Sequence, residues 1–143
     1  MKSYSETSIF EPAEMRYLWD AEKLVKLLPD HLGELRCHEV ARVVAHLLKL
    51  PVADGTYGAV DHSWCIVPVA HRRLESKTAI ILDPYAVGRL PQVQLVALHP
   101  FVPHGSPSFG YMQHKRRTDI QEELVTNLIA FVRPLLAQEA RTR

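Results

Sequence analysis

The sequence predicts an α+β domain in which helices pack on one small antiparallel sheet. Apolar residues recur at helical spacing near both ends of the chain, and short segments rich in β-branched and aromatic residues follow one another in the middle. The connections between these strand-like segments are too short to hold a crossover helix. We therefore expect neighbouring strands to run antiparallel, with the helices packed against the sheet they form.

Length and composition are those of a globular protein. The chain has 143 residues, of which 47% are apolar and 23% charged, and no repeat or long linker divides it. We expect a single domain over residues 1–143. The formal net charge of +1 gives no reason to expect a nucleic-acid partner.

The chain lacks a signal-peptide pattern and any apolar run of membrane-spanning length, so we expect a cytoplasmic protein without a membrane partner. The sequence leaves the oligomeric state open. In a reducing compartment the two cysteines, Cys37 and Cys65, are not expected to form a structural disulfide. Each is then either a small buried residue or a reactive group.

Three helices are expected. The first runs from about Pro12 to Leu28, and the second from Arg36 or Cys37 to Lys49 with a broad apolar stripe that favours a central position against the sheet. The third begins near Thr118, where Thr118 and Gln121 fit a capping box, and Pro134 is expected to kink or end it.

The strand-like segments lie between the second and third helices. They are residues 52–57, 63–70 and 78–82, followed by 93–98. The polar residues 71–77 are typical of a hairpin loop, and Pro68 suggests an edge or a bulge in its strand. The rest of the proline-rich stretch 83–109 is expected to be an ordered covering loop.

Three residues have the properties of a thiol catalytic site. A thiol nucleophile needs stabilisation of its thiolate, a neighbouring base and a group that orients the base. Cys37 lies in the first turn of a predicted helix, where the positive end of the helix dipole favours an anion. His62 lies where one strand begins and Asp83 where the next ends, so antiparallel pairing would make the two neighbours.

The segments around these residues resemble the three signature segments of the transglutaminase-like superfamily of papain-related cysteine enzymes. They are Arg36-Cys37-His38-Glu39-Val40-Ala41-Arg42, His62-Ser63-Trp64 and Ile81-Leu82-Asp83-Pro84-Tyr85. The resemblance covers residues 36–85. It implies a transglutaminase-like core with a buried helix that begins at the cysteine, with Cys37 as nucleophile, His62 as base and Asp83 as orienting acid.

Other residues are candidates for contact with the substrate. Trp64 shares the strand face of His62 and either shields the imidazole from water or packs in the core. Tyr85 either lines the pocket or packs in its turn, and His31 precedes the Cys37 helix. Cys65 should face away from His62 and belong to the core.

The resemblance implies a hydrolase or acyltransferase that acts on an amide or thioester carbonyl of a peptide, protein or small acyl substrate, as a peptidase, deamidase or transglutaminase-type enzyme, without a cofactor. The alternative is a catalytically inactive binding or scaffold domain of the same fold. A zinc protein that uses Cys37, His38, His62 and Cys65 is a further alternative, although no established zinc motif occurs and no metal is expected.

Overall fold

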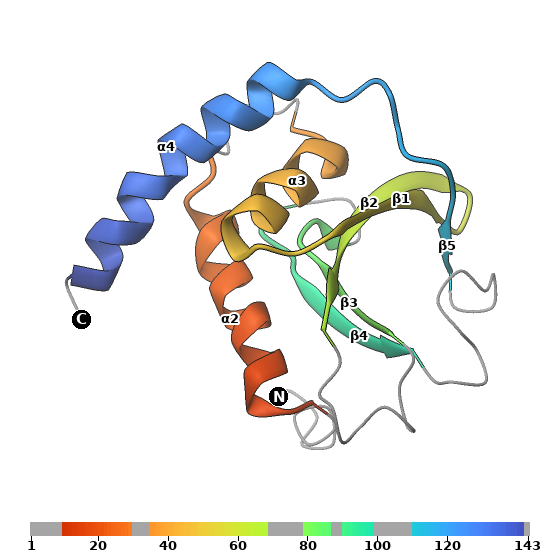
Figure 1. The fold of residues 1–143 in the computed structure, drawn as a ribbon, viewed down its shortest axis with the longest axis horizontal. Helices are drawn as coiled ribbons and strands as arrows, with labels where there is room; N and C mark the ends of the chain where they lie inside the picture. The colour runs from red at the N-terminus through yellow and green to blue at the C-terminus, as the bar shows by residue number, and fades with distance from the viewer. Residues whose placement is uncertain (1–9, 30–34, 69–78, 87–89, 99–109, 142–143) are drawn as a thin grey trace.

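The computed structural model describes residues 10–29, 35–68, 79–86, 90–98 and 110–141. Within these residues it contains three helices and a curled five-stranded antiparallel sheet, which confirms the predicted α+β class (Figure 1). The helices are α2 (Pro12–Lys26), α3 (Cys37–Leu48) and α4 (Glu122–Arg141). The strands are β1 (Val52–Tyr57), β2 (Val60–Val67), β3 (Ala79–Asp83), β4 (Gln94–Leu98) and β5 (Tyr111–Gln113).

The strands lie in the order β4-β3-β2-β1-β5. The first four form a meander, and the short β5, which the sequence did not reveal, returns to pair with the outer side of β1. Strands β2 and β3 are paired only between Cys65–Val67 and Ile80–Leu82. His62 and Asp83 therefore lie just beyond the paired residues of these two strands.

Helix α3 occupies the central position that its broad apolar stripe predicted. It contacts α2, α4 and the strands β1 and β2, and Figure 1 shows all three helices on one side of the sheet. Its residues Val40, Val43 and Val44 are completely buried. The helix ends where Lys49 adopts a left-handed conformation with φ of 60°, a common way to terminate a helix.

The beginning of β2 differs from the prediction. The strand starts at Val60, three residues earlier than expected, because the turn that joins it to β1 contains only Gly58 and Ala59. His62 is therefore a strand residue. The edge suggested by Pro68 is wrong, since β2 pairs on both sides and Pro68 follows its last residue.

The start of α4 also differs from the prediction. The helix begins at Glu122, so Thr118 does not cap it, and the backbone N–H of Gln121 donates instead to the buried carboxylate of Glu39 at 2.9 Å. Pro134 lies inside the helix and does not end it. Leu128 and Val132 of this helix are buried, whereas Phe131 is half exposed.

The core has two parts, one on each face of the sheet. The larger part lies under the helices, and Cys65 belongs to it. The smaller cluster on the other face consists of Ala53, Trp64, Ile81, Leu98 and Tyr111. In the described part of the chain, none of the helices combines the length and apolar character needed to cross a bilayer. The predicted hairpin loop 71–77 lies outside the described residues.

The close approach of β5 to β1 predicts that Gly55 tolerates no side chain. A Cβ atom at Gly55 would lie 1.9 Å from the backbone oxygen of Met112. Gly55→Ala should therefore lower the free energy of unfolding by about 3 kcal/mol, measured by urea denaturation. The matched control is Gly58→Ala, which meets only the conformational penalty of φ +62° in open space and should cost about 1 kcal/mol. Equal losses from the two variants would contradict the described β1–β5 pairing.

Candidate active site

His62 and Asp83 form a buried hydrogen-bonded pair. The distance between Nε2 of His62 and Oδ2 of Asp83 is 2.7 Å, and the residues are 7% and 2% exposed. This confirms the prediction that the two residues are neighbours, although they meet beyond the paired part of β2 and β3. Because Nε2 is bonded to the carboxylate, Nδ1 is the nitrogen left for a reacting group.

Asp83 is held in place by two further donors. The Tyr111 hydroxyl donates to Oδ2 at 2.8 Å, and the backbone N–H of Tyr85 donates to Oδ1 at 3.1 Å. Gln94 in turn donates to the Tyr111 hydroxyl oxygen at 2.9 Å. Burial and the charge of Asp83 raise the pKa of Tyr111, so the phenol keeps its proton and remains a donor. The carboxylate is thus fixed from three directions.

Cys37 is the first residue of α3, as predicted, and its thiol is partly exposed. Burial alone would raise the pKa of Cys37, but interactions with His38 and His62 outweigh burial and lower it to about 6. The pKa of His62 moves in the opposite direction. Burial would lower it, but hydrogen bonding to Asp83 and interaction with Cys37 raise it to about 9. Between these values the favoured state is a thiolate beside an imidazolium.

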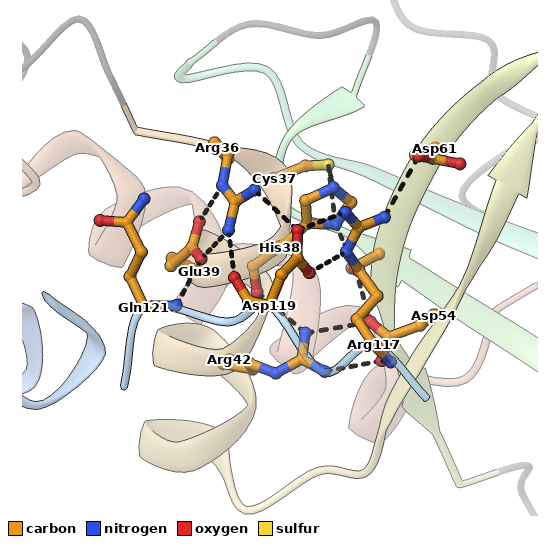
Figure 2. A network of polar contacts seen from close by, with 11 residues as sticks. Arg36, Cys37, His38, Glu39, Arg42, Asp54, Asp61, Arg117, Asp119 and Gln121 are labelled. Carbon is orange, nitrogen blue, oxygen red and sulfur yellow. Dashed lines mark hydrogen bonds and ion pairs between the residues drawn. The ribbon is translucent and has the colours of Figure 1, made fainter. Parts of the chain in front are cut away.

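A second histidine contacts the thiol, and it is the neighbour of Cys37 in the sequence (Figure 2). Sγ of Cys37 lies 3.7 Å from Nδ1 and 4.0 Å from Nε2 of His38. The same Nδ1 lies 2.7 Å from the hydroxyl of Ser63. The sequence did not predict this contact between His38 and the thiol.

Ser63 connects His38 to a buried ion pair. The Ser63 hydroxyl donates to Oδ1 of Asp54 at 2.6 Å. Arg42 binds both oxygens of Asp54, at 3.0 and 2.6 Å, as Figure 2 shows. Burial would raise the pKa of Asp54, but hydrogen bonds from Arg42, Ser63 and the backbone of Arg117 lower it to about 2. The sequence indicates the contact between Ser63 and His38 only through the alternation of β2, which makes Ser63 face the opposite side of the sheet from His62.

The beginning of α3 is held by a second buried carboxylate, that of Glu39. Nε of Arg36 donates to Oε1 of Glu39 at 2.8 Å, and the backbone of Gln121 donates to Oε2 (Figure 2). Burial would raise the pKa of Glu39, but these partners lower it. Arg36 also reaches the backbone oxygen of Asp119 at 3.0 Å. The segment before α4 is thereby joined to the start of α3.

The other predicted site residues have different surroundings. Trp64 is fully buried, with its ring centroid 6.1 Å from that of His62 and 5.1 Å from that of Tyr111, so it packs in the core while covering the imidazole. The Tyr85 hydroxyl donates to the backbone oxygen of Leu35 at 2.9 Å, and burial and the charge of Cys37 raise its pKa. His31 lies outside the described residues.

Cys65 lies in the core, and the described residues offer no cluster that could hold zinc. Cys65 faces α3, where its thiol donates to the backbone oxygen of Ala41 at 3.4 Å, and burial raises its pKa well above the ordinary value. Its predicted place in the core is confirmed. Among the described residues, no three His, Cys, Asp or Glu side chains gather in a way that could hold a metal ion.

Three comparisons with known proteins give no match. The chain matches no protein-family model, no curated protein and no solved structure. The chemistry of the site is therefore inferred from its own residues and their geometry.

The different environments of the two cysteines predict selective alkylation. Iodoacetamide at pH 6.5 should modify Cys37 and leave Cys65 unmodified in the folded protein, as measured by peptide mass spectrometry, because only Cys37 is both partly exposed and ionised. His62→Ala should slow this reaction about tenfold, since the thiolate loses a cationic partner. Equal and slow modification of both cysteines would rule out an activated thiol.

Proposed function

We propose that this protein is a thiol-dependent hydrolase or acyltransferase that acts on an amide or thioester carbonyl through Cys37, His62 and Asp83. The observation that carries the proposal is the buried 2.7 Å bond between His62 and Asp83, beside a helix-start thiol whose pKa is lowered to about 6. A thiol, a base and an orienting acid in this relation are the parts of a cysteine nucleophile system. The α+β arrangement, with the cysteine opening the central helix, is compatible with a transglutaminase-like core.

In the proposed acylation step, the Cys37 thiolate attacks the carbonyl carbon and a C–S bond forms. The carbonyl electrons move to oxygen and give a tetrahedral oxyanion. When this intermediate collapses, the bond to the leaving group breaks, and the leaving amine or thiol takes the proton from Nδ1 of the His62 imidazolium. Asp83 keeps the imidazole oriented and stabilises its positive charge.

Deacylation completes the cycle. Neutral His62 accepts a proton from the incoming water or amine, whose oxygen or nitrogen attacks the thioester carbon. The C–S bond then breaks, and the thiolate and the imidazolium are restored. Water as the acceptor gives hydrolysis, whereas an amine gives acyl transfer.

The start of α3 provides a donor for the oxyanion. Within the described part of the chain, the N-cap residue Arg36 makes no side-chain capping bond to the helix backbone. Its side chain binds Glu39 instead. The backbone N–H of Cys37, at the positive end of the helix, therefore has no partner within the helix and can donate to an oxyanion formed on its own sulfur.

Exposed apolar side chains lie on the strands that carry the imidazole. Tyr57 is 44% exposed, and its ring centroid lies 6.1 Å from that of His62. Val60, at the start of β2, is 68% exposed. An exposed aromatic ring near the imidazole can contact the apolar part of a peptide or small acyl substrate.

The proposal predicts a covalent acyl-enzyme on Cys37. Incubation with p-nitrophenyl acetate should release nitrophenol in a burst and increase the intact mass by one acetyl group, because an activated ester acylates any competent thiolate. His62→Ala and Asp83→Asn should each lower the rate of acylation at least about a hundredfold. Cys65→Ala is the matched control and should acylate at the wild-type rate.

The outcome also separates an enzyme from an inactive domain of the same fold. Acylation of wild-type protein at the same rate as His62→Ala would show that the thiol is not activated, and it would favour the scaffold alternative. A mass increase on Cys65 would contradict the assignment of the nucleophile.

A further inference from the structure

Two histidines, rather than one, interact with the Cys37 thiol, and each is backed by a buried carboxylate. His62 reaches Asp83 directly, whereas His38 reaches Asp54 through the hydroxyl of Ser63. The link from His38 to Asp54 consists of two short hydrogen bonds of 2.7 and 2.6 Å between buried groups. His38 is needed for neither the acylation nor the deacylation step described above.

The direction of the hydrogen bonds in this chain can be deduced. Asp54 is ionised and accepts from Arg42, so Ser63 must give its single hydroxyl proton to Asp54. The Ser63 oxygen then accepts from His38, which requires a proton on Nδ1 of that ring. Only Nε2 of His38 is left to gain or lose a proton, and it lies 4.0 Å from the Cys37 sulfur.

We propose that Asp54, Ser63 and His38 form a second histidine relay, in which His38 is a positioning residue whose imidazole is held against the Cys37 sulfur. The relay deepens the proposed function and depends on it, because it acts on the same thiolate. Its role differs from that of His62. His62 gives a proton to the leaving group and accepts one from the incoming water or amine, whereas His38 transfers no proton and stays beside the sulfur through both steps.

The pH dependence of Cys37 reactivity is set by the ionisable groups that face its thiol. His38 faces it from α3, His62 from β2, and Tyr85 from the turn after β3. Asp83 and Asp54 act through the two histidines. The pKa of Tyr85 is raised above its ordinary value of 10.0, so this phenol stays neutral between pH 5 and 9. The profile between pH 5 and 9 therefore contains no contribution from the ionisation of Tyr85.

The test uses His38→Asn in the full chain. The amide nitrogen of asparagine takes the place of Nδ1 and can still donate to Ser63, but the side chain cannot carry a positive charge. The second-order rate constant for iodoacetamide is measured from pH 5 to 9, and circular dichroism verifies the fold. The midpoint of the profile should rise by about one pH unit and the rate at pH 6 should fall about fivefold.

Ser63→Ala provides a second route to the same result. It leaves His38 in place but removes the acceptor for its Nδ1 proton, so the midpoint should rise by a smaller amount in the same direction. It also keeps the test decisive if His38→Asn does not fold. A folded variant of either kind with the wild-type midpoint overturns the relay and leaves the proposed function intact. A wild-type midpoint near the ordinary thiol value of 9.0 overturns both.

Discussion

The position of the Cys37 thiol depends on one buried carboxylate, that of Asp54. It accepts hydrogen bonds from Arg42 on α3, from Ser63 on β2 and from the backbone of Arg117, while its own backbone oxygen accepts from His114. One side chain of β1 therefore joins the central helix, the neighbouring strand and the segment that leads to α4. Loss of either partner of such a buried ion pair costs about 3–5 kcal/mol, because it leaves an unpaired charge.

The hydrogen bonds of Asp54 hold α3 against the sheet, and those of Glu39 hold the first turn of the helix. Because Glu39 binds both Arg36 and the backbone before α4, the start of the helix is held from within and from outside. The other half of the site belongs to the sheet, where Tyr111 of β5 and the turn after β3 hold Asp83. Cys37 and His62 are thus carried by separate elements that are each held by buried hydrogen bonds, an arrangement that keeps the two side chains in place without a covalent link.

The sequence predicted the elements that carry strong local patterns. Periodicity identified α3 and placed Cys37 at its start, and antiparallel connectivity made His62 and Asp83 neighbours. It also placed Cys65 in the core, because alternation along a strand is reliable in a central sheet.

The interactions that local pattern could not reveal join residues far apart in the sequence. Strand β5 has only three residues, and its Tyr111 meets Asp83 of β3 although β1 and β2 lie between these strands in the sheet. The capping box predicted at Thr118 failed because Glu39, on another helix, binds Gln121. The contact between His38 and the Cys37 sulfur was not predicted, for a different reason. Adjacent helical side chains diverge at Cβ, but the Cys37 sulfur still lies against the imidazole that Ser63 holds in place.

The central claim is that Cys37 is a thiolate near neutral pH, stabilised by the histidines around it. The most direct measurement is the ultraviolet absorbance of the thiolate as a function of pH, taken as the difference between wild-type protein and Cys37→Ala. Interaction with His38 and His62 lowers the pKa of Cys37, so the difference should show an ionisation with a midpoint at about pH 6. A midpoint near the ordinary thiol pKa of 9.0 would contradict the account.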